Sequence, residues 1–286
     1  MRLPILIFLC VFGVFALALE DARYPGGVAI VPLSEFGKIA PIAFCDDRRL
    51  KIQKLPSGEW AAIVGVSIDA KPNANKYLSY WTIEGKSAIV PFKIGDKAYP
   101  IQRLTIDQSM EALDQATIDR VAKERGIIAA AIAEFSEDIG GDTRMRAPLI
   151  APISSAFGLR RVINKTPRRP HSGTDLAAPK GTPIAAPSSG VVALEGSHFY
   201  CGNFVLLNHG EGLFTLYCHL DRSAVKTGQA TKTGAIVGYV GATGRVTGAH
   251  LHWSAALNGA WFDPLLLVSR ADLAKLTPKP QSPQKR

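Results

Sequence analysis

The residues that could carry out chemistry gather in the second half of the chain. All six histidines lie between residues 171 and 252, and the sharpest patterns among them are His171-Ser172-Gly173-Thr174-Asp175 and His250-Leu251-His252. Successive side chains of a strand point to opposite faces, so His250 and His252 are expected to share one face. Two imidazoles would then point into one cleft, where a further donor pair from His171 and Asp175 could complete a metal site.

Imidazole and carboxylate donors suit a borderline ion such as zinc. The chain has no pair of cysteines at the short spacing of structural zinc sites. A three-ligand site that leaves one position for water, which is the catalytic arrangement, therefore fits better. Spacing alone decides neither which of His250 and His252 binds the metal nor whether a fourth protein ligand closes the site.

A further histidine could reach the same cleft. His219 lies in the strand-like run 214–220, where regular alternation places it on the face of Tyr217 and turns Cys218 to the opposite face. An imidazole beside the metal could take a proton from water or stabilise an oxyanion, because its usual pKa lies near neutrality. His198 and His209 are expected to be structural or exposed.

Two β domains joined by a helical segment are expected to position these residues. Between residues 24 and 104, short apolar runs alternate with turns rich in Pro, Gly and Asn, which predicts a small β-sandwich. Residues 107–137 have apolar residues at helical spacing, which predicts one helix, or two divided at Gly126, packing between the β domains. Strands return from about residue 147 to residue 270.

The amino end of the chain indicates export. Arg2 and the apolar run from Leu3 to Ala18 have the charged start, apolar centre and small-residue exit of a secretory signal peptide. Charged residues follow too early for a membrane span, which needs about 20 apolar residues, so no integral span is expected after cleavage. The predicted units are a signal peptide at 1–18, a β domain at 20–104, a helical linker at 105–146, the chemical domain at 147–270 and a disordered tail at 271–286.

Composition narrows the class and the partners. Of the 286 residues, 47% are hydrophobic and 20% are charged, which excludes a largely disordered chain or a collagen-like fibre. The formal net charge of +9 favours an anionic partner such as nucleic acid, anionic lipid or an acidic cell-wall polymer. Export, and the lack of a basic helix or an aromatic RNA-binding motif, argue against nucleic acid.

Between residues 153 and 264 the motifs follow one another in a fixed order. They are Ile153 to Arg160, His171-Ser172-Gly173-Thr174-Asp175, Asn208-His209-Gly210, Tyr217-Cys218-His219-Leu220, Gly241-Ala242-Thr243-Gly244, His250-Leu251-His252, Asn258-Gly259 and Asp263-Pro264. Together they resemble the lysostaphin-type, LytM-like zinc metallopeptidases that cleave peptidoglycan peptides. The resemblance implies a mainly β fold whose C-terminal domain is an antiparallel β metallopeptidase domain of the duplicated hybrid motif kind.

Carried over position by position, the resemblance implies that His171, Asp175 and His252 bind Zn²⁺ and that His219 and His250 are unligated catalytic histidines. The implied function is a secreted zinc-dependent endopeptidase that hydrolyses peptide bonds in peptidoglycan stem peptides or cross-bridges, in the periplasm, the cell envelope or outside the cell. The alternative is a non-catalytic LytM-like envelope protein that binds peptidoglycan or activates an amidase. Such proteins typically lack a metal ligand, whereas all three positions are filled here.

The cysteines depart from the family pattern. Once Cys10 is removed with the leader, the mature chain keeps Cys45, Cys201 and Cys218 in an oxidising compartment where a disulfide can persist. Because regular alternation turns Cys218 away from the face of His219, we expect a Cys201–Cys218 disulfide behind the site. Cys45 is then expected to be a buried free thiol in the first domain.

Overall fold

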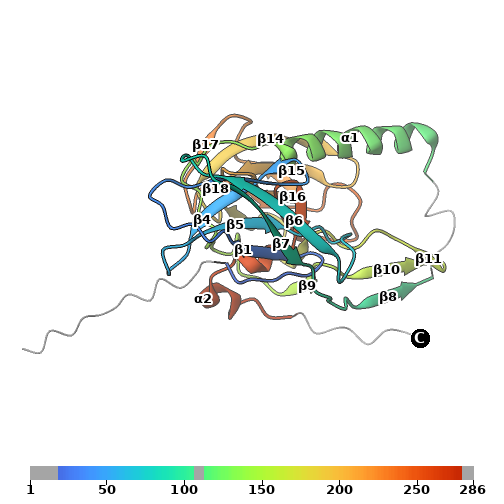
Figure 1. The fold of residues 1–286 in the computed structure, drawn as a ribbon. Coiled ribbons are helices and arrows are strands. Elements are labelled where there is room, and N and C mark those ends of the chain that lie inside the picture. Colours follow the sequence, from blue (N-terminus) through green and yellow to red (C-terminus); the bar gives the residue numbers. More distant parts are fainter. Residues whose placement is uncertain (1–18, 106–112, 279–286) are drawn as a thin grey trace, which may run out of the picture.

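The computed structural model of the protein describes residues 19–105 and 113–278, and these residues form mainly β-structure (Figure 1). The predicted signal peptide lies outside the described residues, as do residues 106–112 and 279–286. Among the helices that the structure describes, none is long and apolar enough to cross a membrane.

The N-terminal region is a small β-sandwich, as predicted. One sheet has the order β1 (Val28–Pro32), β5 (Trp60–Gly65), β4 (Lys51–Lys54), and the other has the order β3 (Arg48–Arg49), β2 (Ile42–Cys45), β6 (Asn75–Trp81), β7 (Ser87–Lys93). Buried apolar side chains from both sheets form one cluster between them. Cys45 belongs to this cluster as a free thiol, as expected, and burial raises its pKa to about 11.

The C-terminal region is built on a ten-stranded antiparallel sheet, which confirms the predicted fold class. Its main path has the order β17 (Ala230–Thr231), β14 (Gly190–His198), β15 (Gly202–Asn208), β16 (Leu213–Ser223), β19 (Leu251–Leu257), β12 (Thr174–Leu176), β9 (Ile153–Ser155). Three further strands branch from it, namely β13 (Pro183–Ala185), β18 (Ile236–Val240) and β20 (Ala260–Phe262). A 3₁₀ helix at Pro264–Leu267 and the short α2 (Arg270–Leu273) follow.

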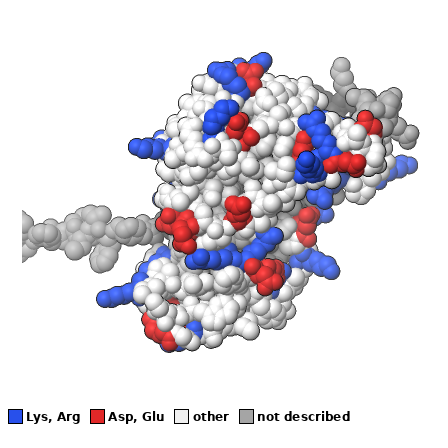
Figure 2. All heavy atoms as spheres, turned by 90° about the horizontal axis from the view of Figure 1, so that it is seen from above, with Lys and Arg blue, Asp and Glu red and all other residues white. Residues whose placement is uncertain are grey.

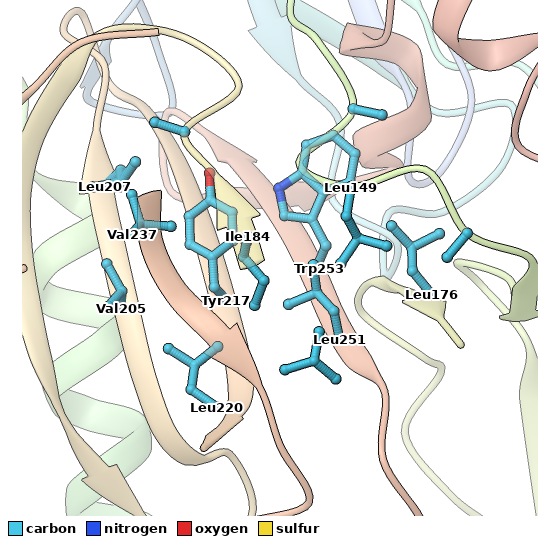
Figure 3. Packing of buried hydrophobic residues seen from close by; sticks show 14 of the residues in the cluster. Leu149, Leu176, Ile184, Val205, Leu207, Tyr217, Leu220, Val237, Leu251 and Trp253 are labelled. Carbon is cyan, nitrogen blue, oxygen red and sulfur yellow. The ribbon is translucent and has the colours of Figure 1, made fainter. Parts of the chain in front are cut away.

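The core of this region determines which side chains of β19 remain available for chemistry. Tyr217 and Leu220 from β16 lie in one apolar cluster with Leu251 and Trp253 from β19 (Figure 3). Leu251 and Trp253 are completely buried. Because side chains alternate along a strand, His252 points to the opposite face of the sheet.

The sandwich docks on the carboxyl end of β19. Alternate residues of β1 and β5 turn away from the sandwich core and enter a second apolar cluster with residues of β19, β20 and the 3₁₀ helix: Val28, Ile30, Ala61, Ile63, Ala255, Leu257, Phe262 and Leu267. Arg48 Nη1 also donates a hydrogen bond to the Asn258 carbonyl at 3.1 Å. These contacts lie at the opposite end of β19 from His252.

A third, three-stranded sheet connects the sandwich to the segment that precedes His171. In it β8 (Ile101–Leu104) runs parallel to β10 (Arg160–Ile163), which pairs with β11 (Thr166–Pro167). The Tyr99 ring packs on the Phe157 ring with centroids 6.2 Å apart. The Leu159 carbonyl, just before β10, then accepts a hydrogen bond from the His171 amide at 3.0 Å, so this region supports the start of the His171–Asp175 motif.

Residues Gln115–Ala133 form a single helix, α1, and Gly126 lies inside it without dividing it. The Asp114 side chain caps its amino end by accepting from the Thr117 amide at 2.7 Å. Ile128 and Ile132 pack on apolar side chains of β15 and β16. The predicted position between two β domains is therefore wrong, because the apolar stripe of α1 covers the sheet of the second domain (Figure 1).

The ordered structure also continues past the predicted start of the tail at residue 271. After α2, Leu276 is buried in the main core of the second domain. The Thr277 carbonyl accepts a hydrogen bond from the Ile153 amide at 2.8 Å, and Pro278 bridges to the same residue. In the sequence, Leu276 is the residue that indicates an ordered segment here, because one buried apolar side chain can anchor a short segment beside a strand edge.

His209 gives the fold a pH dependence. It is 1% exposed, its Nδ1–H donates to the Ser189 carbonyl at 2.8 Å, and its Nε2 accepts from the Thr215 hydroxyl at 2.7 Å. Burial lowers the pKa of His209 from 6.5 to about 4. Below pH 6.5 the unfolded chain therefore binds a proton that the native protein binds only near pH 4, and stability falls over this interval.

We expect this histidine alone to reduce the free energy of unfolding by roughly 3 kcal/mol between pH 6.5 and pH 4. Urea unfolding of chelator-treated protein at several pH values measures the effect. The His209→Gln variant has no group that titrates there, so its stability should fall less steeply. Identical slopes for the two proteins would show that His209 does not carry this dependence.

Candidate metal centre

Adjacent strands bring His171, Asp175 and His252 together. Asp175 on β12 is paired directly with His252 on β19, and directly opposite residues of an antiparallel pair share a face. The Asp175 Oδ1 atom lies 2.8 Å from His252 Nδ1 and 3.1 Å from His171 Nε2. The three ligand atoms lie within 4.8 Å of one another, which is a spacing that could hold a metal ion.

Hydrogen bonds on the far side of each ring fix how these imidazoles point. His171 Nδ1 donates to the Ala156 carbonyl at 2.9 Å, and because a carbonyl only accepts, the Nε2 lone pair faces Asp175. His252 Nε2 lies 2.9 Å from the Ser254 hydroxyl, which leaves Nδ1 facing the site. Metal-bound histidines usually have such a partner on the second nitrogen, which orients the ring.

Electrostatics keep the acidic member of this group ionised. Burial raises the pKa of Asp175, but the two imidazoles beside it, those of His171 and His252, outweigh this effect and hold the pKa well below the usual value. Burial lowers the pKa of His252 despite its hydrogen bond with Asp175. At neutral pH the pair is therefore a carboxylate beside a neutral imidazole, which are the protonation states that metal binding requires.

A close approach of the backbone explains the glycine in the motif. A Cβ atom on Gly173 would lie 2.5 Å from the Ser254 hydroxyl and 2.7 Å from His252 Cε1. Any larger residue would displace the His252 ring or its hydrogen-bond partner.

His219 and His250 lie beside this group. Their ring centroids are 4.8 Å apart, and the His219 centroid is 5.9 Å from that of His252. His219 Nδ1 donates to the Thr243 carbonyl at 3.0 Å and His250 Nδ1 donates to the Gly248 carbonyl at 2.9 Å. Both rings thus keep Nε2 as the nitrogen with a free lone pair, which can accept a proton.

The backbone at His219 breaks the alternation that the sequence predicted. Its φ angle is +64°, and the strand pairs with β19 up to Cys218 but with β18 from Leu220 onward. Tyr217 and Leu220 both point into the core (Figure 3), so the bulge leaves Cys218 and His219 together on the face that carries His252. The Cys201–Cys218 disulfide is formed, but it lies beside the site and not behind it as expected.

Several partners of the site were missed in the sequence. Ser254 could have been found, because it lies two residues after His252 and therefore on the same face of β19. Ala156 and Thr243 act through backbone carbonyls, for which no residue type gives a signal. His198 stacks on Phe204 with centroids 4.4 Å apart, and His209 is buried elsewhere, so both have structural contacts as predicted.

The basic charge of the chain does not form one patch on the face shown in Figure 2. Lysine and arginine side chains there are interspersed with aspartate and glutamate. Near the histidines, Arg161 Nη2 donates to the Ser155 hydroxyl at 3.4 Å, and that hydroxyl lies 3.2 Å from His171 Nδ1. Arg160 is exposed on β10.

Comparison with known proteins identifies the family. The model described as Peptidase family M23 matches residues 169–264, and the model described as Peptidase family M23 N-terminal domain matches residues 22–97. The crystal structure of a putative peptidase M23 from Pseudomonas aeruginosa is 34% identical, with a TM-score of 0.73, over 87% of this chain and 96% of that chain. The chain therefore belongs to peptidase family M23.

Two curated relatives carry names that describe an activity. The peptidoglycan DD-endopeptidase ShyA of Vibrio cholerae is 43% identical over 129 residues, which are 43% of this chain and 30% of that protein. The DD-carboxypeptidase/endopeptidase Mpg of Neisseria meningitidis is 42% identical over 113 residues, which are 40% of this chain and 26% of that protein. The chain thus covers less than a third of the length of either relative.

The environment of His219 leads to a spectroscopic prediction. Burial, together with the neighbouring His252, lowers the pKa of His219 from 6.5 to about 4. In metal-free protein the ring should therefore remain neutral, with its proton on Nδ1, from pH 8 down to pH 5. Long-range ¹H–¹⁵N spectra of histidine-labelled protein report the tautomer, and the His219→Gln variant assigns the signals. A titration midpoint near 6.5 would contradict this account.

Proposed function

We propose that this protein is an exported, zinc-dependent endopeptidase that hydrolyses peptide bonds in peptidoglycan. The observation that carries the proposal is the convergence of His171, Asp175 and His252, with His219 and His250 beside them. Membership of family M23 and the two relatives named for peptidoglycan and for DD-bonds support the substrate class. The signal-peptide pattern of residues 1–18 supports export to the periplasm, the envelope or the exterior.

In this proposal His171, Asp175 and His252 hold the zinc ion. Two imidazoles and one carboxylate are a donor set typical of catalytic zinc, and their hydrogen-bond partners already orient the rings. The bound ion would supply a Lewis acid that lowers the pKa of a water molecule and polarises the scissile carbonyl.

His219 and His250 are proposed to move the protons. Each has its Nδ1–H committed to a backbone carbonyl, so Nε2 is the atom that accepts a proton from the attacking water. Once protonated, the same atom can donate a hydrogen bond to the developing oxyanion.

Metal content tests the ligand assignment. Purified protein should contain about one zinc ion per chain, and His171→Ala or Asp175→Ala should lose it, because two ligands do not retain the ion. Elemental analysis after dialysis measures this. His198→Ala is the matched control, since His198 stacks on Phe204 and contacts none of the three ligands. A His171→Ala protein that retains zinc at wild-type stoichiometry would contradict the assignment.

Hydrolysis tests the catalytic roles separately. His250→Ala should retain zinc yet cleave cross-linked peptidoglycan fragments at least about 100-fold more slowly, because only proton transfer is removed. Chromatography with mass spectrometry of the released fragments gives the rate and identifies the bond that is cut. Wild-type protein that holds zinc but cleaves no peptidoglycan preparation would instead support the alternative, a non-catalytic envelope protein that binds peptidoglycan or activates an amidase.

A further inference from the structure

The turn at residues 199–201, between β14 and β15, lies against the backbone of His219. Cys201 in this turn is disulfide-bonded to Cys218, which immediately precedes His219. The Cys201 carbonyl also accepts a hydrogen bond from the His219 amide at 2.7 Å. Cys201 therefore holds His219 in two ways, by a covalent bond to its neighbour and by a hydrogen bond to its own backbone.

The residues after Cys201 hold the group to which the His219 ring is bonded. The Asn203 amide donates to the Thr243 hydroxyl at 2.9 Å, and that hydroxyl donates to the Leu220 carbonyl at 2.8 Å. Gly202 lies so close to Thr243 that any side chain there would overlap it. Since the Thr243 carbonyl accepts the His219 Nδ1–H, the turn fixes both the backbone and the ring of His219.

The backbone of His219 requires such support. Its φ of +64° is a left-handed conformation that non-glycine residues rarely adopt and that persists only where the surroundings enforce it. In a regular strand, Leu220 would leave the core and His219 would leave the face that carries His252. The bulge therefore directs His219 toward the group formed by His171, Asp175 and His252. The disulfide joins this bulge to the turn.

We propose that the Cys201–Cys218 disulfide is a positioning element of the active site, which holds the bulge that presents His219 Nε2 to the reacting groups. The catalytic consequence rests on the proposed function, whereas the effect on His219 itself does not. The metal-binding residues lie on or beside β12 and β19, so the disulfide acts on His219 without contributing a ligand.

The protein should fold without the disulfide. The Glu124 carboxylate of α1 accepts a hydrogen bond from the Phe199 amide at 2.8 Å, and the Arg245 amide donates to the Tyr200 carbonyl at 3.2 Å. Apolar packing around Cys218 is provided by Phe204, Leu216 and Ile132, and an alanine can take the place of the sulfur. The turn would remain attached but would no longer be fixed to His219.

The kinetic test is a double-mutant cycle on the full chain. The Cys201→Ala/Cys218→Ala variant should lose at least about tenfold in kcat on peptidoglycan fragments, with KM and zinc content unchanged, because small displacements of a proton-transfer group are costly. In a His219→Ala background the same two substitutions should change kcat within about twofold. Cys45→Ala, which removes a free thiol in the sandwich, is the matched control and should keep wild-type kcat.

A spectroscopic test applies whether or not the protein is a hydrolase. In metal-free wild type the His219 Nδ1–H resonance should exchange slowly with water, and in the double-alanine variant it should broaden or disappear while the His171 and His252 signals persist. An unchanged His219 resonance, an equal loss of kcat in the His219→Ala background, or loss of zinc from the variant would each overturn the proposal. If hydrolysis by the His219→Ala variant is too slow to measure, the His219 resonance in the wild type and in the double-alanine variant tests the proposal.

Discussion

The direct pairing of Asp175 with His252 across β12 and β19 is the contact on which the rest of the site depends. A slip of one residue would place Leu251 or Trp253 opposite the carboxylate and would turn the histidine into the core. The complete burial of Leu251 and Trp253 excludes that slip, because exposing them would cost much of the apolar stabilisation of the sheet. The apolar core thus determines the geometry of a polar site on its other face.

The sequence was sufficient for whatever follows from strand periodicity, and insufficient where distant segments decide the conformation. The shared face of His250 and His252, and the sandwich of short strands, follow from local pattern alone. The bulge at His219 does not, because it arises where β16 exchanges β19 for β18 as its partner. The same is true of the parallel pairing of β8 with β10, which joins residues far apart in the chain.

The sequence also contains an indication that the sandwich packs against the second domain, although the alternation of apolar runs and turns makes it hard to recognise. Val28–Val31 and Ala61–Val64 are continuous apolar runs, as expected for strands that are buried on both faces. One face of these strands builds the sandwich core and the other packs on the second domain. Because β1 and β5 contribute side chains to both apolar clusters, the sandwich and the second domain pack as a single body. Helix α1 covers a different part of the ten-stranded sheet.

The parallel pairing of β8 with β10 has a mechanical consequence. β8 follows the sandwich in the chain and pairs with β10, and the Leu159 carbonyl next to β10 accepts a hydrogen bond from the His171 amide. The hydrogen bonds between paired strands act together to resist sliding of one strand past the other. A pull on the sandwich would therefore be transmitted to the loop that bears His171. A displacement of the sandwich would in this way reach His171, although the two lie in different sheets.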